Sequence, residues 1–419
     1  MLFPESVTAQ LDTEDFYLAE IEGIIDPAIS SYIEKCITRA QQDGRALIIQ
    51  MDTPGGLETS MRDIIKAMLA SPVPIIVYVA PQGARAASAG VFITYAADIA
   101  AMHPSTHIGA AHPVSMGISQ ADEESMKKIT NDSVAFIQNL AESRGRNSQW
   151  AAKAVTESDS ITASQALELK VIDFTAASLD ELMDNMDNMQ VEKQGQNYIL
   201  KTSNARIEPL ESSLINRFLH IIANPNIAYI LFLLGMLGII YEFSQPGLGI
   251  SGALGVLFLL LGLYAFSILP VNYAGLGIIV LGVILFIVDI EAGTGGILSA
   301  CGAISLILGS LLLIDSPAPY LNIAKPLIIG ASGLISVMAV IAIRALYMSR
   351  RIKPATGSLS MVGRQATAVS DLSPQGQVKI DGEIWRAVSE EGSVEKGRKV
   401  SITRIRGLTL YVKQINQGG

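Results

Sequence analysis

Residues 71–90 read SPVPIIVYVAPQGARAASAG, and this stretch indicates how the first part of the chain folds. Its apolar, β-rich run at 75–80 breaks at Pro81 and Gly83, and alanines and a glycine then surround Ser88. We expect a buried strand and, after it, a helix that begins near this serine. The hydroxyl would face a cleft beside helix-terminal N–H groups that can hold a developing oxyanion. A tight strand–helix crossover without chemistry is the alternative, because short motifs are weakly specific.

A second buried-strand pattern, ALIIQM at 46–51, runs into DTPGG at 52–56. Glycine reaches backbone conformations that are closed to other residues, so a Pro-Gly-Gly turn can free backbone N–H groups. Acyl transfer requires such donors, aimed at the carbonyl oxygen under attack. One strand thus ends in a candidate oxyanion hole and a later strand ends in a candidate nucleophile.

Composition indicates that part of this chain lies in a membrane. Its 419 residues carry a formal charge of −9, and 50% are hydrophobic but only 16% charged. A soluble protein of this size is usually less apolar. The mild acidity and the scattered Lys and Arg disfavour nucleic acid as a partner. The two cysteines, Cys36 and Cys301, and the four histidines follow no disulfide or metal-ligand spacing, so we expect no metal and no cofactor.

Residues 15 to about 185 alternate between predicted strands and helices. The strands are expected at 16–21, 46–51, 75–80 and 99–102, and the helices at 28–42, 57–70, 91–97 and 126–143. Such alternation implies βαβ crossovers and a largely parallel sheet, which is an α/β fold. The polar stretch at 180–196 indicates a solvated hairpin or a linker.

Residues 226–343 are almost uncharged. Their only charged residues are Glu242, Asp289, Glu291, Asp315 and Lys325. A bilayer span needs roughly 20 apolar residues, and breaks divide this block into runs at 226–241, 248–269, 273–290, 295–314 and 326–348. We expect four to five transmembrane helices, with glycines at their contacts. The acidic residues lie near the breaks between these runs. They either have a role at the membrane interface or mark a polar pathway through the membrane.

Basic residues after the last apolar run indicate the topology. Arg344, Arg350, Arg351 and Lys353 place the C-terminal part in the cytoplasm by the positive-inside rule. With five spans the N-terminal domain is extracytoplasmic. The first residues, MLFPESVTAQLDTEDF, show no signal-peptide pattern. Either a signal peptide is missing from this sequence, which we favour, or the number of spans is even and both soluble ends are cytoplasmic.

The C-terminal part is expected to be a small all-β unit. Alternating runs at 365–369, 376–380, 383–388, 399–403 and 408–412 are separated by turn residues, which suits a five-stranded OB-like barrel. Trp385 and Tyr411 are its only aromatic residues, so the stacking platform of single-strand nucleic-acid binders is missing. A docking or regulatory module is the better interpretation.

Several motifs carry a family resemblance. They are MDTPGG at 51–56, ARAASAG at 84–90, KITN at 128–131, SRGRN at 143–147, ITASQALELKVID at 161–173 and VGRQATAVSDLSPQGQVKIDGEIWRAV at 362–388. Residues 16–174 resemble the Clp-like, crotonase-type serine protease domain. The whole chain resembles the long form of the NfeD family, whose members are membrane proteases encoded beside stomatin-type proteins. We place the protease domain with its polar linker at 1–205, the membrane domain at 206–353 and the OB-fold domain at 354–419.

The resemblance implies a serine–lysine dyad, with Ser88 as nucleophile and Lys128 of KITN as general base. Lysine acts as a base only when burial lowers its pKa. On a continuous helix, however, Lys128 falls about 200° from Met126, on the polar face. Lys127 is its nearest competitor. As oxyanion hole the resemblance points to the N–H groups of Gly55, Gly56 and Ala89.

A rival Ser–His–Asp triad is also visible. His112 follows Ser88 by 24 residues, and Asp159 precedes the ITASQAL stretch, which are the approximate places of the Clp-type histidine and aspartate. A loop histidine and a helix-capping or turn aspartate are the alternatives.

The leading hypothesis is a membrane-anchored serine endopeptidase that cleaves hydrophobic segments near the bilayer. The resemblance implies a stomatin- or flotillin-like partner, and dimerisation of the protease domain or a higher homo-oligomer. A non-catalytic scaffold that organises membrane microdomains is the main alternative. A crotonase-type acyl-CoA enzyme is a third possibility, disfavoured by the small residues around Ser88 and by the membrane block.

Overall fold

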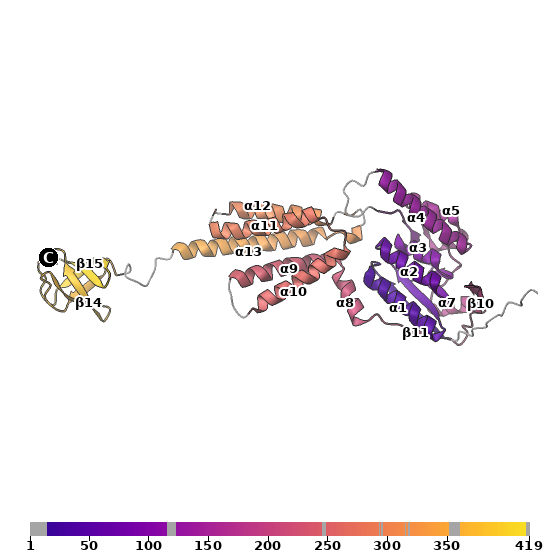
Figure 1. Ribbon diagram of the computed structural model, residues 1–419, viewed down its shortest axis with the longest axis horizontal. Coiled ribbons are helices and arrows are strands. Elements are labelled where there is room, and N and C mark those ends of the chain that lie inside the picture. Colours follow the sequence, from indigo (N-terminus) through magenta and orange to yellow (C-terminus); the bar gives the residue numbers. More distant parts are fainter. Residues whose placement is uncertain are drawn as a thin grey trace, which may run out of the picture. The chain divides into compact units, whose positions relative to one another are not determined.

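The computed structural model describes residues 15–114, 123–244, 249–292, 294, 296–314, 316, 319–351 and 361–415 (Figure 1). The chain divides into two compact units, one of residues up to 284 with 301–334, the other of 285–300 with 335–419. The start that bears on a signal peptide, residues 1–14, and Lys353 lie outside the described residues. The domain boundaries at 205 and 353 stay predictions.

A six-stranded parallel sheet forms the centre of the N-terminal domain, which confirms the α/β fold. Its order is β11 (Arg206–Pro209), β1 (Asp15–Glu22), β2 (Ala46–Asp52), β3 (Ile75–Val79), β5 (Ile99–Met102) and β8 (Phe174–Thr175). Met51 pairs with Val79, and Val79 with Met102, so the carboxyl ends of three neighbouring strands are level. The loops that follow these strands therefore meet at one edge of the sheet.

Helices bury both faces of this sheet because its strands are apolar throughout. In β1, Tyr17 and Ile21 pack into one core and Phe16 and Leu18 into the other. The first core is covered by α1 (Pro27–Asp43), α2 (Glu58–Ala70), α3 (Ala89–Ala96), α4 (Glu123–Ser143) and α5 (Ser148–Thr156). The four helices expected from the sequence correspond to α1, α2, α3 and α4.

The second face is covered by the polar stretch that the sequence indicated as a solvated hairpin or linker. It forms α7 (Leu179–Met186) and a hairpin of β9 (Gln190–Lys193) and β10 (Gln196–Ile199). The hairpin is packed, not solvated: Lys193 is buried and its Nζ lies 2.6 Å from Asp98 Oδ2. Arg144 also forms an ion pair with Asp98. This buried cluster of three charged residues fixes the hairpin against the sheet.

A small second sheet lies next to the first and was not expected. Its strands are β4 (Arg85–Ala87), β6 (His107–Gly109) and β7 (Ser160–Thr162), and β4 follows directly on the break at Pro81 and Gly83. A short helix, α6 (Ala163–Glu168), follows β7 behind a capping box. Ser88 is the single residue between β4 and α3.

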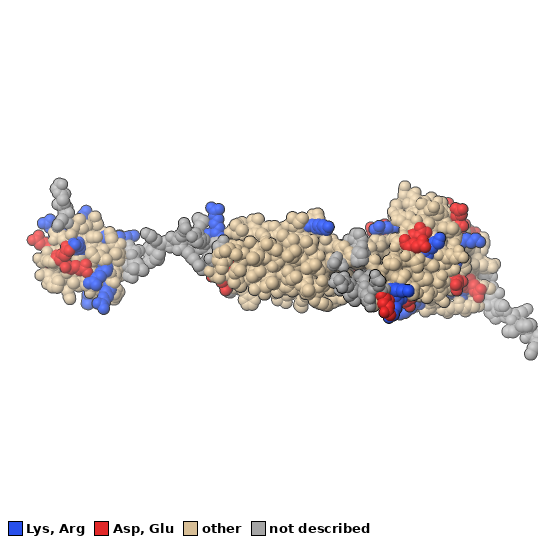
Figure 2. All heavy atoms as spheres, turned by 90° about the horizontal axis from the view of Figure 1, so that it is seen from above, with Lys and Arg blue, Asp and Glu red and all other residues tan. Residues whose placement is uncertain are grey.

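Apolar helices follow the N-terminal domain. They are α8 (Leu214–Ile222), α9 (Pro225–Ser244), α10 (Ile250–Ile268), α11 (Tyr273–Ala292), α12 (Ile297–Leu313) and α13 (Lys325–Arg351). Within the described residues, 225–243 and 250–268 are long and apolar enough to cross a bilayer, and 273–289, 297–313 and 325–341 form shorter apolar helices. On the face seen in Figure 2 this region carries few charged side chains.

Glycines bring α9 and α10 into backbone contact, as the sequence predicts for helices packed in lipid. A Cβ atom on Gly235 would lie 2.5 Å from the backbone nitrogen of Leu259, and one on Gly255 would lie 2.7 Å from that of Ile239. Neither position has room for a larger residue.

Two acidic residues near the helix ends, Glu242 and Asp289, accept hydrogen bonds from residues at or near the start of the next helix. Glu242 accepts hydrogen bonds from the Ser251 hydroxyl and, at 3.3 Å, from the Gly252 N–H at the start of α10. Asp289 accepts from the Ser299 N–H at 3.0 Å, near the start of α12. Carboxylates at helix N-termini satisfy free N–H groups there. These bonds support the interfacial role for both residues.

Residues 361–415 contain a closed five-stranded barrel, as expected. Its order is β12 (Gln365–Ala368), β13 (Gln375–Ile380), β14 (Glu383–Ser389), β16 (Thr409–Gln414) and β15 (Lys399–Arg406), with β14 and β16 parallel. Alternate residues such as Val378, Val400 and Leu410 fill its core. The exposed apolar side chains Ile384 and Leu408 lie on its outer surface.

Candidate active site

Ser88 lies in a strained strand-to-helix junction. Its backbone has φ 52° and ψ −113°, a conformation that L-residues rarely adopt. The Ser88 N–H donates to the Gly109 carbonyl at 3.1 Å, and the Ala87 N–H donates to that of Thr53 at 3.1 Å. These bonds fix the junction from both sides. Ser88 is half-buried on this turn, and a serine on a sharp, strained strand-to-helix turn is the geometry of the nucleophile elbow.

Glycines allow the turn after β2 to approach the serine. A Cβ atom on Gly55 would lie 2.7 Å from the Ser88 Cβ, and Gly55 has φ +121°. A Cβ atom on Gly56 would lie 2.2 Å from the carbonyl oxygen of Ile25. The Pro-Gly-Gly motif is therefore required here by backbone packing, whatever chemistry the site performs.

Not every N–H group of this turn points to the serine. The Gly55 N–H donates to Thr53 Oγ1 at 3.0 Å, and that hydroxyl lies 3.1 Å from the Gly55 carbonyl. Gly56 and Ala89 both line the cavity in front of Ser88. Ala89 is the first residue of α3, where N–H groups have no intrahelical acceptor. The geometry thus favours Gly56 and Ala89 as donors over Gly55.

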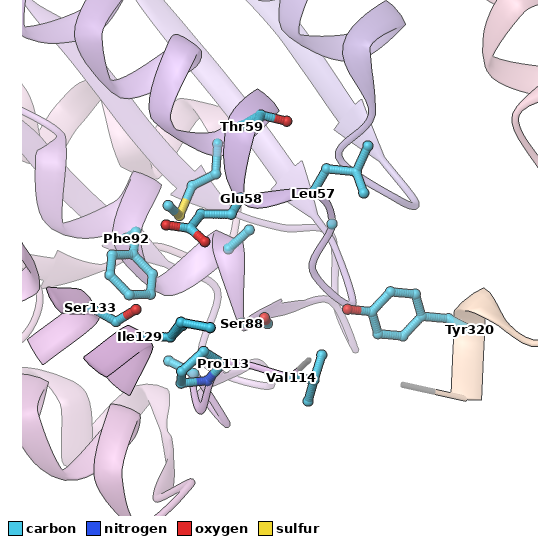
Figure 3. A pocket seen from close by; sticks show the side chains of 14 residues that line it. Leu57, Glu58, Thr59, Ser88, Phe92, Pro113, Val114, Ile129, Ser133 and Tyr320 are labelled. Carbon is cyan, nitrogen blue, oxygen red and sulfur yellow. The ribbon is translucent and has the colours of Figure 1, made fainter. Parts of the chain in front are cut away.

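An apolar cavity of about 390 Å³ opens beside Ser88 (Figure 3). Residues from α2, α3 and α4, from the glycine turn, from the loop after β6 and from a turn before α13 form it, and they include Leu57, Phe92, Ala111, Pro113, Val114, Ile129, Ser133 and Tyr320. No local pattern in the sequence marks these residues as a group, because most are ordinary apolar side chains at the ends of separate elements. A hydrophobic side chain is the ligand that such a lining suits.

The structure places Lys128 on the solvent side of α4. Its Nζ pairs with Glu124 Oε1 at 2.9 Å, and the two side chains are 73% and 71% exposed. The helical spacing predicted this polar face. Ile129, the next residue in the sequence, lines the cavity. Lys128 is thus the direct sequence neighbour of a residue of the site.

His112 and Asp159 are bonded elsewhere. His112 Nδ1 lies 2.7 Å from the Val155 carbonyl, and Asp159 Oδ2 accepts a hydrogen bond from Trp150 Nε1 at 2.9 Å. Within the described part of the chain no hydrogen bond joins His112 to Ser88 or to Asp159. No cluster of metal-ligating side chains occurs among these residues either.

One residue at the site lies far from the rest in the sequence. Tyr320 belongs to a 3₁₀ turn, η1 (Pro319–Leu321), between α12 and α13, and its hydroxyl interacts with the Ser88 side chain. Figure 3 shows this hydroxyl pointing toward the serine. Burial is the main reason that the pKa of Tyr320 is raised above the usual tyrosine value. No local pattern in the sequence predicts this contact.

Three family models match successive parts of the chain. The NfeD1b N-terminal domain matches residues 15–194, the NfeD integral membrane domain matches 226–345, and the NfeD-like C-terminal, partner-binding domain matches 359–414. The middle match identifies the apolar helices as an integral membrane domain.

Relatives match over almost the full length. The membrane-bound protease PH1510 of Pyrococcus horikoshii is 33% identical over 96% of this chain and 94% of its own length. The membrane protein NfeD1b of Bacillus subtilis is 27% identical over 98% of this chain and 95% of its own length. A solved lysine-to-alanine variant of the 1510-N membrane-bound stomatin-specific protease, in complex with a substrate peptide, is 33% identical, with a TM-score of 0.47 over 51% of this chain and 99% of that chain. With an ordered set of three matching domains and a full-length relative of this identity, the chain belongs to the NfeD family.

Proposed function

We propose that this protein is a membrane-anchored serine endopeptidase and that Ser88 is its nucleophile. The observation that carries the proposal is the strained serine at the start of α3, facing the glycine turn and an apolar cavity. The full-length similarity to a membrane-bound protease supports it. An apolar cavity beside the serine favours substrates with hydrophobic side chains next to the cleaved bond.

In the proposed reaction the Ser88 oxygen attacks the substrate carbonyl carbon, and the N–H groups of Gly56 and Ala89 stabilise the oxyanion. The new bond joins the serine oxygen to the acyl carbon, while the peptide C–N bond breaks. The serine proton passes through the general base to the leaving amine, and water then hydrolyses the acyl-enzyme.

We propose Lys128 as the general base, as the KITN motif implies. Lys128 is exposed and paired with Glu124, so its side chain must leave this pair and become buried before it can act as a base. Its place next to Ile129 makes that step short, because Ile129 already lines the cavity. Substrate, or a second copy of the chain in a homodimer, would supply the cover. His112, oriented by Asp159, is the alternative base.

A fluorophosphonate probe tests the nucleophile in the full-length membrane protein. We expect labelling that is lost in Ser88→Ala. A folded protein that remains unlabelled would contradict the proposal.

Peptide cleavage by single variants then identifies the base. Lys128→Ala should abolish cleavage, and the matched control Lys127→Ala, an exposed neighbour on the same helix, should not. Cleavage that survives Lys128→Ala and disappears in His112→Ala would assign the role to the histidine.

The second candidate function is a non-catalytic scaffold for a stomatin- or flotillin-like membrane protein. It is favoured by the match of residues 359–414 to a partner-binding domain. In the enzymatic proposal the same barrel binds the stomatin-like partner, whose apolar segment is the substrate. Partner binding that persists while Ser88 stays unlabelled would favour the scaffold.

We further propose that the chain crosses the bilayer five times, with the protease domain extracytoplasmic and the C-terminal barrel cytoplasmic. The five helices from α9 to α13 and the basic residues after Arg344 support this topology. Added protease should therefore cleave only the N-terminal domain in cells with a permeabilised outer face. Cleavage of both ends from one side would contradict it.

A further inference from the structure

The side chain that covers Ser88 comes from the membrane domain. Tyr320 reaches the serine from the short connection between α12 and α13, and its hydroxyl and the Ser88 side chain both lie within 3.1 Å of the Cβ position of Gly55. Its hydroxyl lies 2.8 Å from the point where a Cβ atom on Gly55 would stand. Residues up to 284 and residues 301–334 form one compact unit, so this contact lies within it.

The turn that carries Tyr320 is held in place by its neighbours. Asn322 binds Ser316 twice, accepting from the Ser316 N–H at 3.0 Å and donating to the Ser316 carbonyl at 2.7 Å. The Ala324 N–H donates to Asn226 Oδ1, at the start of α9, at 2.8 Å. Leu321 is almost fully buried. The tyrosine is therefore presented by an anchored turn.

Tyr320 lines the same apolar cavity as Phe92 and Ile129, at the end that lies beyond Ser88. In Figure 3, Phe92 and Ile129 are on one side of the serine and the tyrosine ring is on the other. An endopeptidase substrate must extend past the nucleophile in both directions, because the cleaved bond has chain on each side. In this arrangement one of those directions is occupied. Burial keeps the tyrosine hydroxyl protonated, so it does not serve as the base.

We propose that Tyr320 is a plug: it closes the cleft beyond Ser88 in the resting protein, and an extended substrate reaches the serine only after the turn moves away. Through this residue the membrane domain controls access to the nucleophile. The inference rests on the proposed function of Ser88. Small molecules that enter through the apolar cavity are not excluded by the plug, whereas a polypeptide is.

Thiol accessibility tests the plug without requiring catalysis. The full-length protein with Ser88→Cys and Cys301→Ser is reacted with a small methanethiosulfonate and with a bulky, polymer-linked maleimide. Cys36 contributes little, because it is buried and burial raises its pKa to about 11. Adding Tyr320→Ala should raise the rate of the bulky reagent about tenfold or more, because that reagent reacts only with the open fraction. The small reagent should change by less than about twofold.

Matched variants keep the test decisive. Tyr273→Ala removes an exposed tyrosine at the start of α11 and should leave both rates unchanged. If Tyr320→Ala unfolds the protein, Cys36 also reacts, and Tyr320→Phe then decides: loss of the hydroxyl alone should raise the bulky-reagent rate about threefold, because the polar contact of the hydroxyl with residue 88 is lost. Equal bulky-reagent rates with and without the ring would overturn the plug.

Fluorophosphonate labelling separates failure of the plug from failure of the proposed function. If neither the wild-type protein nor Tyr320→Ala is labelled at Ser88, the nucleophile is wrong, and the thiol rates still decide whether Tyr320 covers this position. If both are labelled and both cleave a long peptide at equal rates, the plug is wrong and the nucleophile stands.

Discussion

Replacing Thr53 by valine should loosen the turn that carries the candidate oxyanion donors. Valine keeps the shape of this fully buried side chain but removes the hydroxyl that bonds both the N–H and the carbonyl of Gly55. A buried N–H left without a partner costs about 1–3 kcal/mol. For a domain of this size about 2 kcal/mol lowers the unfolding midpoint by roughly 4–8 °C.

The effect on chemistry should be smaller than the loss of a donor. Removing an oxyanion donor outright costs about 10²–10³ in rate. Since Thr53→Val only frees the turn, we expect fluorophosphonate labelling of Ser88 to slow by about tenfold.

Two measurements check this prediction, namely the labelling rate and the thermal unfolding of the N-terminal domain in the full-length protein. Thr156→Val is the matched control, because it also removes a hydroxyl bonded to a backbone carbonyl, but at an exposed position on α5. A Thr53→Val protein that matches the wild type in both measurements would show that the hydroxyl does not hold the turn.

Three further predictions concern packing and pH. Gly56→Ala should abolish labelling of Ser88 by displacing the turn, because the new Cβ would lie 2.2 Å from a backbone oxygen. The hydrogen bond that His220 donates to the Asp26 carboxylate raises the pKa of His220, so their link should stabilise the protein fully below about pH 6.5 and fade as the pH rises through that raised pKa. The midpoint difference between wild type and His220→Gln should therefore shrink between pH 6 and 8.5, and a constant difference would refute the link. Gly255→Val should separate α9 from α10 and lower the thermal midpoint in detergent, whereas Gly277→Val, with open space around its Cβ position, should not.

The large elements of the fold were predictable because each carries its own pattern. The buried strands at 46–51 and 75–80 are continuous apolar runs, and the membrane helices are long stretches almost without charge. The strands β4, β6 and β7 have three residues each, which is too short for a period to appear. Their existence depends on pairing between distant segments, so no local pattern predicts the second sheet.

The same distinction applies to the site. Ser88 and the Pro-Gly-Gly turn were predictable because small residues at strand ends are unusual and serve a clear steric purpose. The polar-face position of Lys128 followed from helical spacing alone. Tyr320 was not predictable, since its place depends on how the connection between α12 and α13 packs against a domain that ends more than a hundred residues earlier.

The anchoring of that connection has a mechanical consequence. Helices in a bilayer tilt when their apolar length differs from the local hydrocarbon thickness. The turn carrying Tyr320 is continuous with α12 and α13 and is tied to the first residues of α9. A change of tilt in these helices would thus be transmitted to the Ser88 hydroxyl as a small displacement of one phenol ring. Access to Ser88, and with it the proposed proteolysis, would respond to the thickness and composition of the surrounding lipid.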